Sequence, residues 1–73
     1  MKISYDREED ILTVEMNPDA RIDHAEQSGP FIAHFTESDR LVLLEILNAS
    51  EFFALALQAS LRNQTVELPV AAH

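Results

Sequence analysis

The fold is decided by residues 31–50, which read FIAHFTESDRLVLLEILNAS. Two apolar runs, 31–35 and 41–47, flank the polar stretch 36–39, and apolar runs of this length between turn residues are typical of strands. These residues therefore predict a hairpin whose second strand is the most apolar in the chain. After this hairpin, the spacing of the apolar residues changes from that of a strand to that of a helix.

Three further strands are expected before this hairpin. Apolar and polar residues alternate on both sides of the charged turn 6–10, which is the period of a half-buried strand. The alternating apolar residues are Met1, Ile3 and Tyr5 before the turn and Leu12, Val14 and Met16 after it. A weaker strand over 21–27 ends at the turn residues 28–30, which include the only glycine. Residues 1–47 thus predict about five short antiparallel strands, a β-meander.

A single helix is expected after the strands. Asn48 and Glu51 fit a capping box, in which the Asn48 side chain accepts from the first-turn amides and Glu51 reaches back. Ser50 is the alternative cap. Good helix formers continue to Arg62, a basic residue at the helix end where the dipole favours positive charge.

The whole chain, residues 1–73, is predicted to form one α+β domain. A small antiparallel β-meander over 1–47 is followed by one C-terminal helix over about 49–62, packed on the sheet. A short edge strand over 65–70 is possible, but Pro69 and the small residues Ala71 and Ala72 favour a loose tail over 64–73. A chain of 73 residues buries only about 60% of the surface that its unfolded form exposes, so we expect marginal stability.

The strand pairing predicts which side chains share a face of the sheet. A three-residue loop at 28–30 places His24 opposite His34, and the turn at 36–39 pairs Phe31 with Leu44. One face then carries Phe31, Ala33, Phe35, Val42, Leu44 and Ile46, which is the expected seat of the helix. The opposite face carries His24, Glu26, Ile32, His34, Leu41, Leu43 and Glu45. A slip of one residue would exchange the two sets.

The predicted helix is apolar around most of its circumference. Its polar residues form a narrow stripe, and a helix of this kind is normally buried on more than one side. One sheet cannot surround a helix, so we expect either a second copy of the chain or the 64–73 tail to cover it, and the sequence favours a homo-oligomer. The expected interface residues are Phe52, Phe53, Leu55, Leu57, Leu61, Ile32, Leu41 and Leu43.

The composition narrows the class of protein further. Thirteen acidic residues against five basic ones give a net charge of −8, which argues against duplex DNA binding because a DNA-binding surface needs clustered Lys and Arg. The absence of cysteine removes disulfides and thiolate chemistry. The first residues have no apolar signal stretch, and no run is long enough to span a membrane. We therefore expect a cytoplasmic protein that binds neither nucleic acid directly nor membrane.

Two segments resemble the domain of unknown function 2283 family, small prokaryotic proteins. The first is MKISYD followed by an acidic turn and ILTV at 11–14; the second is FIAHF, a polar turn and RLVLLEILNAS at 40–50. The resemblance implies a compact β-meander with a C-terminal helix, sometimes encoded beside small toxin-like proteins, and it implies no established activity. The turn 37–39 lacks the glycine that many members have, and residues 51–73 are more apolar than the usual ending.

The strongest candidate for a chemical site is the pair His24 and His34, with Glu26 or Glu45 on the same predicted face. Two histidines and a carboxylate are a recognised ligand set for zinc or iron. The alternative, which the sequence favours, is two ordinary sheet residues without metal. Glu45 lies in the most apolar strand and could be a general base with a raised pKa, although a solvent-facing position or pairing with Arg40 or Lys2 is more usual.

The remaining polar residues offer no convincing active site. The acidic turn 6–10 lacks the alternating ligands and glycine of a calcium-binding loop, and no serine lies in a nucleophile-elbow pattern. We therefore expect no catalytic residues and no cofactor. The favoured function is a homo-oligomeric protein-interaction module without catalysis. The alternatives are an antitoxin-like acidic inhibitor of a small basic protein and a metal-binding domain that uses His24 and His34.

Overall fold

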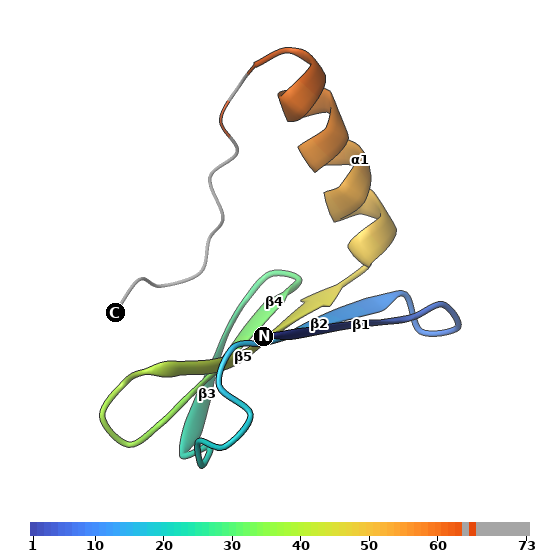
Figure 1. Cartoon of the computed structure of the whole chain (residues 1–73). Helices are drawn as coiled ribbons and strands as arrows, with labels where there is room; N and C mark the ends of the chain where they lie inside the picture. Colours follow the sequence, from blue (N-terminus) through green and yellow to red (C-terminus); the bar gives the residue numbers. More distant parts are fainter. Residues whose placement is uncertain (64, 66–73) are drawn as a thin grey trace.

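The chain folds into a five-stranded antiparallel sheet followed by one helix (Figure 1). This computed structural model describes residues 1–63 and Thr65. The elements are β1 (Lys2–Asp6), β2 (Ile11–Glu15), β3 (His24–Ser28), β4 (Phe31–Phe35), β5 (Leu41–Leu47) and α1 (Ala49–Leu61). The predicted α+β class, with an antiparallel sheet and one C-terminal helix, is confirmed. The predicted 64–73 tail lies, apart from Thr65, outside the described residues.

The strand order places the most apolar strand at the centre of the sheet. The order is β1-β2-β5-β4-β3, and all neighbours are antiparallel. The three strands β3, β4 and β5 follow one another as a meander, and β5 also pairs with the β1–β2 hairpin. A strand with neighbours on both edges can bury more apolar surface than an edge strand, which accounts for the central position of β5. The edge positions go to the more polar strands β1 and β3.

The turn between β3 and β4 corrects the predicted register. Ser28 pairs with Phe31, so the turn holds two residues and not three. One of them, Gly29, has φ 56°, a backbone conformation that glycine adopts without steric cost. A shift of one residue moves every β3 side chain to the other face of the sheet. His24 therefore lies opposite Phe35 and not opposite His34.

The predicted register between β4 and β5 was wrong by two residues, and this error leaves the faces unchanged. Phe31 pairs with Ile46 and Ala33 with Leu44, with an irregularity next to Phe35. The six residues predicted to share the core face do share it, and all but Leu44 are buried. Phe35, at 1% exposed, is the largest fully buried side chain among the described residues.

The helix joins this core at one end of the sheet only. Ala49 is buried with Phe31 and Ile46, and Phe52 packs against them with its ring edge-on to Phe31 at 5.9 Å between centroids. Beyond these first turns, α1 extends away from the sheet (Figure 1). The helix was predicted to pack on the core face of the sheet, and only its first turns do so.

The start of the helix is capped by a residue distant in sequence. Asn48 adopts a left-handed conformation, with φ 51°, and its side chain makes no capping hydrogen bond. The backbone amides of Ala49 and Ser50 instead donate to Asp10, to its carbonyl oxygen at 2.9 Å and to its carboxylate at 3.0 Å. The predicted capping box, and the alternative cap at Ser50, were therefore wrong. The Asp10 carboxylate, from the β1–β2 turn, accepts the first-turn hydrogen bond that an N-cap side chain normally accepts.

Candidate interaction surface

The outer side of α1 carries large apolar side chains that the described part of the chain leaves exposed. Phe53 is 41% exposed, Leu57 60% and Leu61 78%. These three residues are spaced by four, so they form a row along one side of the helix, which we call the outer row. The same helix buries or half-buries Phe52 and Ala59 on another side. Exposed rows of this kind mark interaction sites more often than isolated apolar residues do.

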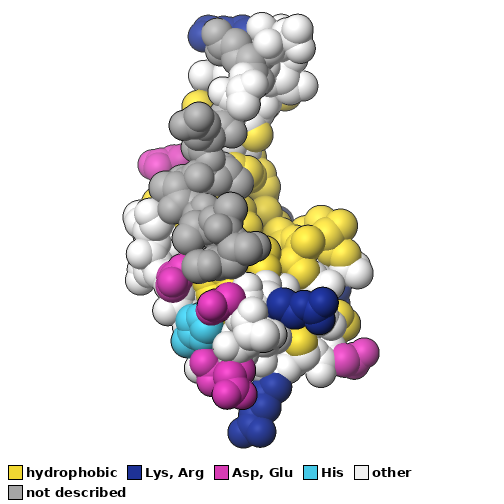
Figure 2. Space-filling view, turned by 90° about the vertical axis from the view of Figure 1, so that its left-hand side faces the viewer, with side chains coloured by type: hydrophobic (Ala, Val, Ile, Leu, Met, Phe, Trp, Pro, Cys, Tyr) yellow, Lys and Arg dark blue, Asp and Glu magenta, His cyan; other side chains and the backbone are white. Residues whose placement is uncertain are grey.

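The outer row continues onto the first strand. The rings of Tyr5 and Phe53 meet edge-to-face, with centroids 5.6 Å apart. Ile3 lies two residues before Tyr5 on the same face of β1 and is 61% exposed. We call Ile3, Tyr5 and Phe53 the apolar corner. Figure 2 shows apolar side chains gathered between the foot of the helix and the sheet.

The remaining predicted interface residues lie elsewhere. Leu55 is 50% exposed, on a different side of α1 from the outer row. Ile32, Leu41 and Leu43 lie on β4 and β5 with intermediate exposure, and their alternation with buried neighbours places them on the face opposite the core. The predicted set is therefore divided between the helix and the second face of the sheet.

That second face holds a histidine–carboxylate pair. His34 Nε2 lies 2.6 Å from Glu45 Oε1, and their side chains are 20% and 31% exposed. Because a carboxylate only accepts, the ring N–H donates this bond. The prediction that the two residues share a face is confirmed, and the partner of Glu45 is this histidine and not the suggested Arg40 or Lys2. The contact orients the imidazole, and its neighbours across the sheet are Ala25 and Leu43.

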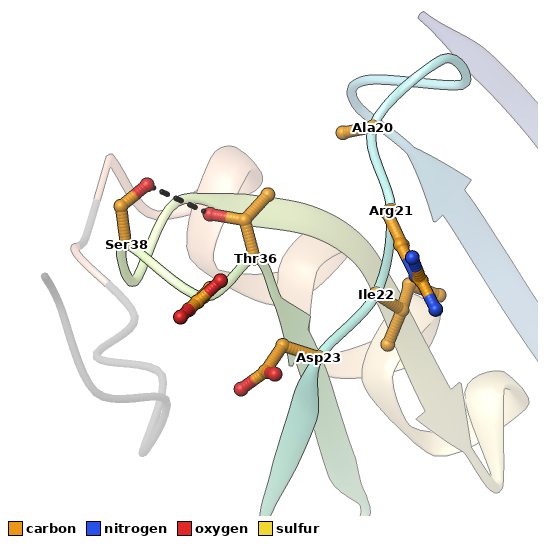
Figure 3. Close-up of a pocket in the computed structure, with 7 residues that line it drawn as sticks. Ala20, Arg21, Ile22, Asp23, Thr36 and Ser38 are labelled. Atoms are coloured by element: carbon orange, nitrogen blue, oxygen red, sulfur yellow. Dashed lines mark hydrogen bonds between the residues drawn. The ribbon is translucent and has the colours of Figure 1, made fainter.

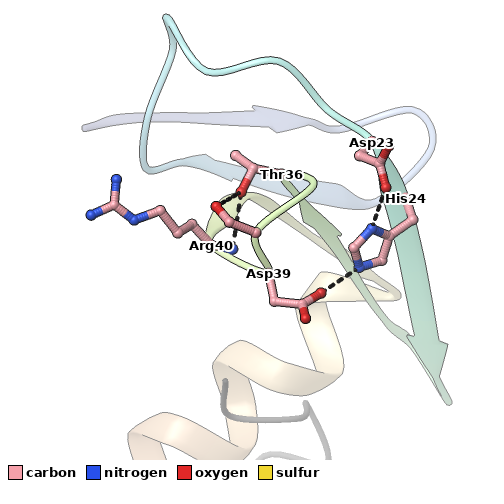
Figure 4. A network of polar contacts seen from close by, with 6 residues as sticks. Asp23, His24, Thr36, Asp39 and Arg40 are labelled. Atoms are coloured by element: carbon pink, nitrogen blue, oxygen red, sulfur yellow. Dashed lines mark hydrogen bonds and ion pairs between the residues drawn. The ribbon is translucent and has the colours of Figure 1, made fainter.

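His24 lies on the core side of the sheet, between two carboxylates (Figure 4). Its Nδ1 is 2.8 Å from Asp23 Oδ2, and its Nε2 is 2.9 Å from Asp39 Oδ1. Both ring nitrogens must carry a proton to satisfy two acceptors, which favours the positively charged imidazolium. The hydrogen bond to Asp23, helped by the charge of Asp39 against some desolvation, raises the pKa of His24. The ring stacks on buried Phe35, with centroids 5.5 Å apart.

Asp39, which contacts His24, has a left-handed backbone conformation. It has φ 63° in the β4–β5 turn, where its amide donates to the carbonyl of Thr36 at 3.0 Å. Aspartate tolerates the left-handed region better than most residues, so this turn forms without glycine. The Asp39 side chain, which glycine would lack, contacts His24 at the start of β3.

The two histidines do not form the suggested metal site. The corrected register places His24 and Glu26 on one face of the sheet and His34 on the other. Within the described residues, no group of three or more His, Cys, Asp or Glu side chains is arranged to hold a metal ion. The expectation that His24 and His34 are neighbours was wrong, because it depended on the length of the turn at 28–30.

The carboxylates of Asp6 and Asp10 hold the acidic turn between β1 and β2 together by hydrogen bonds. Asp6 Oδ1 accepts from the amides of Glu8 at 3.0 Å and Glu9 at 3.2 Å. The Tyr5 hydroxyl donates to Asp10 Oδ1 at 2.7 Å. Hydrogen bonds from the Ser50 side chain first, and from Tyr5 second, lower the pKa of Asp10, and the bond to Asp10 raises the pKa of Tyr5. No local sequence pattern indicates this cap, because Asp10 and Ser50 are 40 residues apart.

One open groove lies at the end of the sheet remote from α1. Residues 20–23 form one wall and the turn 36–38 forms the other (Figure 3). The groove contains Arg21, Asp23 and a Thr36–Ser38 hydroxyl contact of 3.1 Å. Its side chains mix both charges with neutral groups, and Asp23 is already engaged by His24. Glu37 also lines the groove, and no hydrogen bond joins the Thr36 or Ser38 hydroxyl to a carboxylate among the lining residues.

Comparison with known proteins identifies a family for this chain. A family model described as a protein of unknown function (DUF2283) matches residues 2–50. The matched segment contains all five strands and the first two residues of α1, and it confirms the resemblance expected from the sequence. No curated protein and no solved structure matches the chain. Among the described residues, no helix is long and apolar enough to cross a membrane.

Proposed function

Because the chain belongs to the DUF2283 family, whose description assigns no function, we propose its role from its surfaces: a homo-oligomeric protein-interaction module without catalysis. The observation that carries the proposal is the exposed outer row of α1, Phe53, Leu57 and Leu61. The sheet is the scaffold in this proposal, and α1, most of which follows the family segment, is the contact element.

The energetics of a small domain support association. Burial of a large apolar side chain contributes about 1.5–3 kcal/mol, and a domain of this size has only a few kcal/mol of net stability. Covering the outer row therefore adds a large fraction of the total stability. Association through these residues would also remove from water the side chains that a lone α1 leaves exposed.

The polar residues support a role without catalysis. Asp10 caps α1, and His24 ties β3 to the β4–β5 turn. His34 is hydrogen-bonded to Glu45 on the second face of the sheet, opposite the core. Each of these side chains has a structural partner, so their arrangement is explained without a reaction.

Size-exclusion chromatography with light scattering on the full chain tests the proposal. The Leu57→Asp variant places a charge in the middle of the outer row and should shift the protein to the mass of one chain. Ile22→Asp is the matched control, because Ile22 is also exposed, at 47%, but lies beside the remote groove. The control should keep the parent mass. Equal masses for the parent and both variants would contradict the proposed interface.

A basic partner protein is the second candidate, supported by the net charge of −8. Opposite potentials speed association and discriminate between partners, which is the behaviour expected of an antitoxin-like inhibitor. Co-purification from the native host tests this candidate. A small basic protein in stoichiometric amount, released by high salt, would support it, and recovery of the chain alone would count against it.

A further inference from the structure

We propose that two chains associate through α1 as an antiparallel, two-fold symmetric helix pair centred on Leu57. In this pair, Leu61 of each chain lies in the apolar corner of the other, formed by Ile3, Tyr5 and Phe53. The inference rests on the proposed function and specifies its partner, a second copy of this chain, and the geometry of its contact.

The spacing of the outer row fits a two-fold axis. Phe53 and Leu61 lie four residues on either side of Leu57. In a two-fold symmetric contact, each residue that meets a second residue is met by it in return. An axis at Leu57 therefore brings Leu57 against its own copy and brings Phe53 against the partner's Leu61 twice.

The charges at the two ends of α1 favour the antiparallel direction. Glu51 lies in the first turn and Asp10 caps the same end, while Arg62 follows the last helical residue. An antiparallel pair places the acidic end of each helix near the basic end of the other. A parallel pair would place like charges together, and it would also align the two helix dipoles. Glu51 and Arg62 point about 120° and 140° around the helix axis from Leu57, so they do not meet across the outer row. The end charges and the helix dipoles favour the antiparallel direction as a long-range effect only.

The apolar corner fits the end of a partner helix. Leu61 is the most exposed residue of the outer row, and an antiparallel partner delivers it beside Phe53. The hydroxyl of Tyr5 already donates to Asp10, so the ring is left to make apolar contacts. The edge-to-face rings of Tyr5 and Phe53, with Ile3 beside them, provide the surface that receives it.

The shape of the chain gives room for this pairing. A helix of 13 residues is about 20 Å long, and most of α1 extends beyond the sheet (Figure 1). Two antiparallel helices can therefore lie side by side with the two sheets at opposite ends. Helices this short cover less than the roughly 800 Å² per partner of a standard interface, so the two apolar corners are needed to complete it.

The absence of cysteine makes disulfide mapping in the full chain a direct test. We expect Leu57→Cys to oxidise almost completely to a covalent dimer of twice the 8.2 kDa chain mass. Leu61→Cys alone should stay monomeric under denaturing conditions, because the two copies lie about 12 Å apart along the axis, beyond the roughly 7 Å limit for a disulfide. A mixture of Phe53→Cys and Leu61→Cys chains should form the mixed disulfide.

Leu55→Cys is the matched control. Leu55 is nearly as exposed as Leu57, at 50% against 60%, but points about 160° away around the helix axis. It should not cross-link. Cross-linking of Leu61→Cys to itself as readily as Leu57→Cys would indicate a parallel pair and overturn the inference. So would a parent that is dimeric by light scattering and a Leu57→Cys variant that does not cross-link, although the proposed function would then survive. A monomeric parent would overturn both.

Discussion

Ser50 donates two hydrogen bonds to the carboxylate of Asp10, from its amide to Oδ1 at 3.0 Å and from its hydroxyl to Oδ2 at 2.7 Å. The two residues are 40 positions apart. Asp10 is the last residue of the β1–β2 turn, and Ser50 is the second residue of α1. The contact fixes where the helix leaves the sheet. It therefore also fixes the direction in which the outer row is presented.

Loss of this long-range cap should destabilise the fold. We expect Asp10→Ala to lower the midpoint of thermal unfolding by several degrees, because the Ser50 amide, the Ser50 hydroxyl and the Tyr5 hydroxyl lose the carboxylate that accepts their hydrogen bonds. Circular dichroism measures the effect. Asn48→Gly is the control, since Asn48 has φ 51° and makes no side-chain cap, so glycine should be tolerated. If Asn48→Gly were as damaging as Asp10→Ala, the cap would have been assigned to the wrong residue.

The His24 contact should stabilise the fold at low pH. Its folded pKa is raised above the ordinary 6.5 by Asp23 and Asp39. The contribution is therefore fully present below about pH 6.5 and is lost as pH rises through the folded pKa. The difference in melting temperature between the parent and His24→Gln should be largest near pH 5.5 and shrink towards pH 8, and solvent exposure should keep it small. A difference that grows with pH would contradict the contact.

The two phenylalanines at the foot of α1 should behave differently. Phe52 packs against the core and Phe53 is 41% exposed. We expect Phe52→Ala to lower the free energy of unfolding by about 2–3 kcal/mol, below the value for a fully buried ring. Phe53→Ala should act mainly by weakening association, so its effect on melting temperature should depend on protein concentration. Denaturant unfolding at two concentrations separates them. Equal, concentration-independent losses would place both rings in the core of one chain.

Metal should not contribute to stability. His24 and His34 lie on opposite faces of the sheet, so no ion can bridge them as a pair. We expect EDTA and added zinc to leave the melting temperature of the full chain unchanged. The His24→Ala/His34→Ala double variant serves as the control for binding at either ring. A loss of stability on chelation in the parent, absent from the double variant, would contradict this expectation.

Part of the fold could be predicted because it depends on local patterns. The alternation in β1 and β2 and the apolar run of β5 were sufficient to predict the strands. The core face was predicted correctly despite a register error, since an error of two residues keeps every side chain on its own face. Phe31 and Ala33 were assigned to the right face with the wrong partners.

The rest could not be predicted because it depends on one residue in a turn or on distant contacts. The turn at Gly29-Pro30 is one residue shorter than expected, and that difference alone separates His24 from His34. The local pattern at Asn48 indicated a capping box, but Asp10 competes for the same amides from 40 residues away. All four described non-glycine residues with positive φ are aspartate or asparagine, namely Asp10, Asp39, Asn48 and Asn63, which tolerate this conformation better than most residues.

The molar mass of the full chain in solution tests the central claim most directly. Sedimentation equilibrium over a dilution series at micromolar concentration should give twice the 8.2 kDa chain mass at the upper end, falling towards the mass of one chain on dilution. A concentration-independent mass of 8.2 kDa would show that the outer row of α1 does not join two copies, and it would contradict the account.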